Sequence, residues 1–143
     1  MTIAAVLAGK GSDVATISAE ALLQDAVAEL ARRNIGALIV TSSDGSVAGV
    51  VSERDLVSCL QKMGGELLAR PVSEAMTAPA ITVDPRTPVL SALALITQKR
   101  VRHLPVVADG RLVGVVSIGD LVKYRIEHIE REAEAMRAYI QGA

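Results

Sequence analysis

The sequence contains no phenylalanine and no tryptophan, and Tyr124 and Tyr139 are its only aromatic residues. Half of all residues are hydrophobic, so a buried core has to be built from Val, Ile, Leu, Ala and Met. Platforms for single-stranded nucleic acid stack bases on aromatic side chains. The shortage of aromatics therefore excludes that class of binding protein.

An excess of one charge is also missing, because 15 Lys and Arg balance 16 Asp and Glu to a net charge of −1. No basic field is present to hold DNA or RNA. Cys59 is the only cysteine, which excludes an intrachain disulfide and a thiolate cluster for zinc or iron–sulfur. His103 and His128 are too few for most metal sites. We expect neither a nucleic-acid partner nor a metal.

Long apolar runs are absent, since no stretch approaches the roughly 18 consecutive apolar residues of a membrane span. The apolar stretch 1–11 is short, is followed at once by Asp13, and lacks the features of a secretory signal. We therefore expect a soluble, cytoplasmic protein with no membrane partner. A chain of 143 residues suffices for one domain, or for two small subdomains that share a core.

The feature that organises the chain is an internal repeat. Gly49–Val57 (GVVSERDLV) recurs as Gly114–Val122 (GVVSIGDLV) at an offset of 65 residues. Upstream, Ala37–Val40 corresponds to His103–Val106 at an offset of 66. The repeat predicts two similar halves.

Each copy is expected to form a β-α-β-β-α unit. The apolar spacing predicts the first helix, and an Asp-Gly pair between apolar runs is typical of a hairpin turn. The first copy would place these elements at 14–17, 22–30, 37–41, 47–51 and from Ser52 onward, and the second at 80–83, 89–96, 103–107, 112–116 and from Ser117 onward. Two such units would dock around a pseudo-twofold axis, with one continuous aliphatic core and clefts between their sheets.

Each repeat ends in a Gly-x-x-Ser-x-x-Asp-Leu segment, which matches the signature of the cystathionine-β-synthase (CBS) domain without a substitution. With the repeat length, the strand order and the Leu-Pro-Val of the second copy, the chain from about Val14 to Lys123 resembles a CBS domain pair. Its tail resembles a bacterial subgroup of stand-alone CBS-pair proteins. The resemblance implies an α+β fold of tandem β-α-β-β-α repeats with pseudo-twofold symmetry.

We divide the chain into 1–70 (N-terminal segment and first repeat), 71–79 (linker with a short helical turn), 80–125 (second repeat) and 126–143 (C-terminal amphipathic helix). The resemblance implies a regulatory module, not an enzyme, that binds an adenine nucleotide. AMP is the first expected ligand, and ATP or NAD(H) are alternatives. The family also implies a homodimer, commonly a flat disc of four repeats, that signals to a regulated protein.

Two Ser-x-x-Asp pairs, Ser52 with Asp55 and Ser117 with Asp120, have two interpretations. A serine at a helix N-cap with an acid three residues later can form a capping box. The resemblance implies in addition that the carboxylate accepts hydrogen bonds from ribose hydroxyls, while the serine and the helix N-terminus meet phosphate. Both roles can coexist.

The resemblance further implies that each site mixes both repeats. The Asp120 helix would serve a cleft lined by Thr16, Ala21, Ile35, Gly36 and Ala37, and the Asp55 helix, with Arg54, a cleft lined by Thr82, Thr87, Val101, Arg102 and His103.

A basic cluster of Lys99, Arg100, Arg102 and His103 either complements a helix end or faces phosphate. Because the first copy has Gly36 and Ala37 where the second has Arg102 and His103, we expect unequal sites, one better suited to polyphosphate. With no ring available to stack on adenine, its faces would lie against aliphatic side chains.

The C-terminal pattern predicts a helix over about 120–141, with Ile126, Ile129, Ala133, Met136 and Ile140 at the a and d positions of two heptads. This stripe packs either on the chain itself, near Ile3–Leu7, or in a dimer seam.

The alternative to a nucleotide sensor is a structural or protein-interaction module whose Ser and Asp residues only cap helices. No catalytic set is evident, and a substrate barrel of about 250 residues does not fit in this chain.

Overall fold

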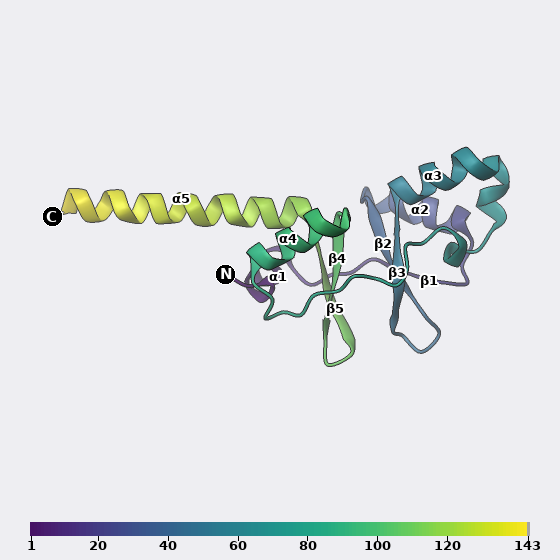
Figure 1. The fold of residues 1–143 in the computed structure, drawn as a ribbon, viewed down its shortest axis with the longest axis horizontal. Helices are drawn as coiled ribbons and strands as arrows, with labels where there is room; N and C mark the ends of the chain where they lie inside the picture. The colour runs from purple at the N-terminus through teal and green to yellow at the C-terminus, as the bar shows by residue number, and fades with distance from the viewer. Residues whose placement is uncertain (143) are drawn as a thin grey trace.

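The computed structural model describes residues 1–142 as two halves, each a small sheet with helices against it, and a long helix that extends from the second half (Figure 1). The first sheet has the order β1-β2-β3 and the second is the hairpin β4-β5. The elements are α1 (Ile3–Lys10), β1 (Thr16–Ser18), α2 (Leu23–Arg33), β2 (Ala37–Thr41), β3 (Val47–Ser52), α3 (Glu53–Met63), the 3₁₀ turns η1 (Gly64–Ala69) and η2 (Val72–Glu74), α4 (Val89–Lys99), β4 (His103–Ala108), β5 (Arg111–Ser117) and α5 (Ile118–Gly142).

The two hairpins confirm the prediction from the Asp-Gly turns. Ala37 pairs with Ser52 in the first hairpin, and His103 pairs with Ser117 in the second. Each hairpin therefore ends with a serine beside the start of its partner strand, and the next helix begins there. This register brings a helix N-terminus to the same point in both halves.

The opening strands are shorter than predicted. β1 covers Thr16–Ser18, where 14–17 was expected, and pairs in parallel with β2. The strand expected at 80–83 is absent, and only Val83 makes a parallel bridge, to Val106. A turn closed by the Thr87 N–H and the Asp84 carbonyl follows at once, and Pro85 has no N–H to donate, so the pairing stops after one residue.

The predicted continuous core is wrong, because the buried residues form two separate clusters. The first half buries Leu23, Ala26, Leu30, Leu38, Val40, Val51, Leu67, Val72 and Ala75. The second buries Ile3, Val6, Val83, Val89, Ala92, Ile96, Leu104, Val106, Val116 and Leu121. The clefts where the halves meet are lined both by apolar side chains such as Val50 and Ile39 and by polar or charged ones such as Ser52, Arg102 and Asp120. Merging the two aliphatic clusters would bury these polar and charged groups as well, and their desolvation would be costly.

We call 1–10 and 70–77 the lead segments, because each precedes one of the two repeats in the chain. Each lead segment packs on the half that its own repeat does not form. The segment ahead of the first repeat packs on the second half, where the Ile3 N–H donates to the Thr87 carbonyl at 2.9 Å. The segment ahead of the second repeat packs on the first half in the same way, with the Val72 N–H 2.7 Å from the Ala21 carbonyl. Residues 1–10, grouped above with 1–70, therefore complete the core of the second half.

Glycine at two equivalent strand positions makes room for the lead segments. A Cβ on Gly49 would lie 2.6 Å from the Thr77 carbonyl oxygen, and one on Gly114 would lie 2.8 Å from a Leu7 methyl. Thr77 cannot retreat, because it exchanges two backbone hydrogen bonds with Val50 at 3.1 and 2.8 Å. The methyl of Leu7 is the end of a side chain and can turn aside.

We predict that Gly49→Ala lowers the free energy of unfolding by about 1–3 kcal/mol, as overpacking does. Gly114→Ala should cost less, since it meets a side chain, and Gly9→Ala, with open space around its Cβ, should cost nothing. Urea denaturation of the three variants checks this order. Equal stability of Gly49→Ala and Gly9→Ala would contradict it.

Candidate functional site

Two clefts of about 260 and 580 Å³ lie between the halves, and each takes residues from both. His103, at the start of β4, lines both clefts. The first cleft is lined by Val50, Ser52, Glu53, Arg54, Asp55, Thr77, Ala80, Ile81 and Lys99–His103. The second is lined by Lys10, Asp13, Ala15, Arg32, Arg33, Ile35, Gly36, Ala37, Ile39, His103, Val115, Ser117 and Asp120.

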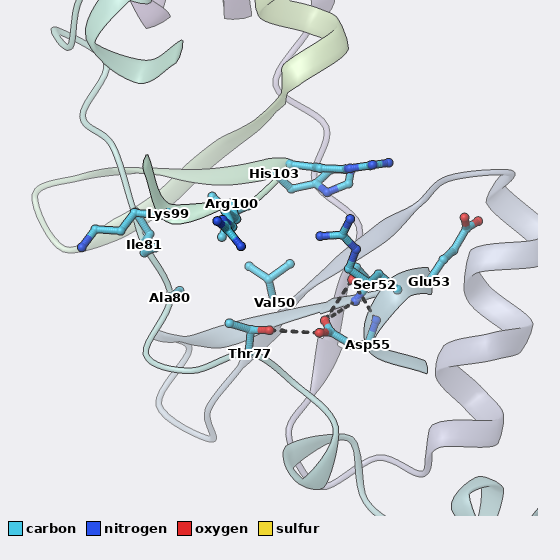
Figure 2. Close-up of a pocket in the computed structure, with 13 residues that line it drawn as sticks. Val50, Ser52, Glu53, Asp55, Thr77, Ala80, Ile81, Lys99, Arg100 and His103 are labelled. Atoms are coloured by element: carbon cyan, nitrogen blue, oxygen red, sulfur yellow. Dashed lines mark hydrogen bonds between the residues drawn. The ribbon is translucent and has the colours of Figure 1, made fainter. Parts of the chain in front are cut away.

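A capping box builds one wall of the first cleft (Figure 2). The Asp55 N–H donates to the Ser52 hydroxyl at 3.2 Å, and the Ser52 N–H donates to Asp55 Oδ2 at 2.9 Å. Thr77 donates its hydroxyl to the other carboxylate oxygen, Oδ1, at 3.0 Å. The cap therefore holds the carboxylate in one orientation at the α3 N-terminus, where the Glu53 N–H donates to the Gly36 carbonyl at 3.0 Å.

The opposite side of the first cleft is basic. Arg100 follows the last residue of α4 as its C-cap in the left-handed region, with φ of 55°, and the chain turns there toward β4. This turn brings Lys99, Arg100 and Arg102 to the cleft, and Arg54 reaches it from α3. Within residues 1–142 none of these four cations takes part in a salt bridge. The first cleft thus carries positive charge that its own chain leaves unneutralised.

The second cleft has the same cap with a different neighbour. The Ser117 N–H donates to Asp120 Oδ2 at 2.8 Å, and the Asp120 N–H donates to the Ser117 hydroxyl at 3.1 Å. Here the lead segment supplies an ammonium in place of a hydroxyl, because Lys10 Nζ lies 2.7 Å from Asp120 Oδ2 and 2.9 Å from the Val115 carbonyl. Asp55 accepts from the neutral hydroxyl of Thr77, whereas Asp120 accepts from the charged ammonium of Lys10. The two carboxylates occupy the same position in the repeat but lie in different electrostatic surroundings.

Ion pairing also occupies the arginines of the second cleft. Burial by itself would raise the pKa of Asp120, but the Lys10 ammonium and the Ser117 N–H outweigh it and lower that pKa below its usual value. Arg32 and Arg33 both bind Glu29, at 2.9 Å each, and lower the pKa of Glu29 to about 2. The cations of the second cleft are therefore already paired, unlike those of the first.

His103 separates the clefts as a neutral group. Burial lowers the pKa of His103 below its ordinary value, and the nearby Asp120 only partly opposes this. The ring lies against Gly36, where an added Cβ would be 3.7 Å from Cε1. A larger residue at position 36 would contact the ring, so the Gly36 predicted for the cleft shapes the wall between the two spaces.

Eleven of the fifteen predicted site residues line a cleft, and Thr16, Ala21, Thr82 and Thr87 do not. Thr16 and Thr82 are exposed outside the lining. Ala21 packs against the first core, and the Thr87 hydroxyl accepts the Asp84 N–H at 3.1 Å. Lys10 and Thr77 were not predicted, and nothing local in the sequence marks them, because each contacts a carboxylate of a distant segment.

The lowered pKa of His103 predicts how stability changes with pH. As pH falls below about 6.5, the unfolded chain takes up a proton at this residue before the folded protein does, so the free energy of unfolding decreases. His103→Gln removes this term and should lose less stability than the wild type between pH 7 and pH 5. Urea midpoints at the two pH values check this, and identical losses in the two proteins would contradict it.

Residues 1–142 contain no group of three or more His, Cys, Asp or Glu arranged to hold a metal ion. No helix in the same range is both long and apolar enough to cross a bilayer.

Comparison with known proteins gives consistent matches. The chain is 37% identical to a CBS-domain-containing protein from Agrobacterium tumefaciens, with a TM-score of 0.84 over 87% of this chain and 99% of that one. It is 28% identical to a CBS domain protein from Pyrobaculum aerophilum solved with AMP, with a TM-score of 0.75 over 84% of this chain and 89% of that one.

Among curated proteins, the chain is 38% identical over 122 residues to the mitochondrial CBS domain-containing protein CBSX3 of Arabidopsis thaliana. That match takes in 82% of this chain but only 59% of the relative's length. The model of the CBS domain matches residues 11–62 and again 72–127. The chain therefore belongs to the CBS domain family, and it carries a pair of CBS domains.

Proposed function

We propose that the protein is a regulatory module that binds an adenine nucleotide in the clefts between its halves and acts as a homodimer. The observation that carries this proposal is the first cleft, where a capped carboxylate, a helix N-terminus and four unpaired cations face one space. A relative of 28% identity was solved with AMP, which supports the ligand class.

Each part of a nucleotide has a matching group in the first cleft. The Asp55 carboxylate offers acceptor oxygens to the two ribose hydroxyls. Phosphate would lie at the N-terminus of α3, near Arg54 and the cations at the end of α4. Val50, Ile81 and Val101 provide an apolar wall for the base, and neither tyrosine of the chain lines the cleft.

The second cleft suits a phosphate-rich ligand less well. Both aspartates already accept hydrogen bonds within the chain, but Lys10 is paired with Asp120 and would have to leave it to reach a phosphate. Arg32 and Arg33 would have to leave Glu29 to reach a phosphate. We therefore propose that the first cleft binds the more highly charged nucleotide, and AMP, ATP and NAD(H) are the candidates to compare.

Regulation would follow from the separation of the two cores. A ligand held by Asp55 on one half and by Arg102 on the other touches both halves at once. Because no shared aliphatic core fixes the halves, such a ligand can favour one relative arrangement over another, and a regulated protein can sense the difference.

Equivalent exposed apolar residues support a homodimer. Val57 of α3 and Val122 of α5 occupy the same position in the two repeats and are 68% and 42% exposed. Leu60 of α3 is also exposed. A second copy would cover this surface, which a monomer leaves to water.

Isothermal titration with AMP, ATP, NADH and S-adenosylmethionine tests the proposal. We predict millimolar or tighter binding of at least one, and a loss of about tenfold or more in affinity in Asp55→Asn, since a hydrogen bond to a charged group is worth about 1.5–3 kcal/mol. Asp109→Asn, in the second hairpin turn outside both clefts, should bind like the wild type.

The structural-module alternative predicts a different result. Asp55→Ala and Asp120→Ala would then lower stability by about 1 kcal/mol, as the loss of a cap does, and no nucleotide would bind the wild type. Absence of binding to all four ligands would overturn the proposed function.

A further inference from the structure

α5 carries an apolar stripe that its own chain leaves uncovered. The helix extends well beyond the body of the protein (Figure 1). The large residues of the stripe are exposed: Val122 42%, Ile126 51%, Ile129 47%, Met136 62% and Ile140 68%. Packing on the N-terminal segment, which the sequence left open, therefore does not cover this stripe.

The opposite side of α5 makes the contacts with the body. Leu121 is fully buried in the second core, and Tyr124 packs against that core. The ring of His128 stacks on Tyr124 with 6.4 Å between centroids. These three residues occupy the c and f positions of the heptad that puts Ile126 at a, so they point away from the stripe. The stripe is thus free for a second protein.

The spacing of the stripe is that of a coiled coil. Ile126, Ala133 and Ile140 fall at a, and Val122, Ile129 and Met136 fall at d. The 19 residues from 122 to 140 keep this pattern without a break. A helix with such a seam is expected to pair with another of the same period.

The charges beside the stripe are self-complementary in one orientation. In a parallel, in-register pair, a g residue faces the e residue five positions later in the partner. Arg125 at g would face Glu130 at e, and Glu132 at g would face Arg137 at e, each pair occurring twice by symmetry. All of these pairs join opposite charges.

The antiparallel pair that overlaps the whole stripe joins like charges. Its centre would lie at residue 131, so Glu130 would face Glu130 of the second copy and Glu132 would face Glu132. Lys123 would face Arg137 in the same arrangement. The e and g charges therefore select the parallel orientation.

We infer that α5 pairs with α5 of a second copy as a parallel, in-register two-stranded coiled coil over 122–140. The inference rests on the proposed homodimer and gives it an orientation. Both bodies then lie at the same end of the coil, so the two second repeats are neighbours.

Cysteine crosslinking tests the register directly. In a Cys59→Ser background, Ala133→Cys places a thiol at a core a position, where the same residue of the second copy is within disulfide reach. Ala135→Cys is the matched control, because position 135 is an exposed c position on the side away from the seam. We expect mild oxidation to yield a covalent dimer from Ala133→Cys and little from Ala135→Cys.

The antiparallel arrangement displaces the two copies of residue 133 by about four residues, or roughly 6 Å along the axis, which exceeds disulfide reach once the gap between helices is added. Equal crosslinking of the two variants, or none, would overturn the inference. Sedimentation of the uncrosslinked protein distinguishes a failure of the coiled coil from a failure of the homodimer. A dimer without crosslinking at 133 overturns the coil alone, whereas a monomer overturns the homodimer as well.

A charge swap tests the pairing independently. Glu132→Arg and Arg137→Glu should each weaken the dimer about fivefold in sedimentation equilibrium, as expected for two partly exposed ion pairs. The double variant Glu132→Arg/Arg137→Glu should return to the wild-type affinity. Failure of the double variant to recover, with both singles impaired, would contradict parallel pairing.

Discussion

The reciprocal cap between a serine and the aspartate three residues later is the interaction on which the two clefts depend. It starts α3 at Ser52 and α5 at Ser117, and in both halves it locks the carboxylate against the backbone of the preceding strand. The hairpin register then places that cap beside Ala37 in the first half and beside His103 in the second, and both of these residues line a cleft. A cap is a local device for satisfying N–H groups. Here the cap also holds the aspartate carboxylate so that it lines a cleft between the halves.

The lead segments make two copies of one motif unlike each other. Both segments dock through equivalent backbone hydrogen bonds, and both approach the aspartate of the cap. One brings the hydroxyl of Thr77 and the other the ammonium of Lys10. The cations of α2 are paired with Glu29, whereas those at the end of α4 are unpaired. The first cleft therefore has cations available for an anionic ligand, and the cations of the second cleft are already neutralised by the chain itself.

The features that were predicted correctly from the sequence are those determined by residues close together in the chain. Asp-Gly turns, β-branched strands and Ser-x-x-Asp caps act over a few positions, so the hairpins and the starts of α3 and α5 were predicted correctly. The unequal sites expected from Gly36 and Arg102 stay a prediction, which the different ion pairing around the two clefts supports.

What the sequence did not predict depends on contacts between distant segments. Lys10 meets Asp120 across 110 positions, and no pattern along the chain links them. The strand expected at 80–83 has the right composition, but the turn after Val83 ends it. The prediction of a continuous core was wrong for a related reason, because the repeat identifies the apolar faces but does not show that they gather into two separate clusters.

If the protein binds an adenine nucleotide as proposed, the capped carboxylates face that nucleotide. A crystal structure of the protein grown with AMP tests this. We expect the ribose hydroxyls within hydrogen-bond distance of Asp55 in the first cleft, with the phosphate toward the N-terminus of α3 and the cations at the end of α4. AMP bound elsewhere on the protein, or both clefts free of nucleotide at saturating AMP, would contradict it.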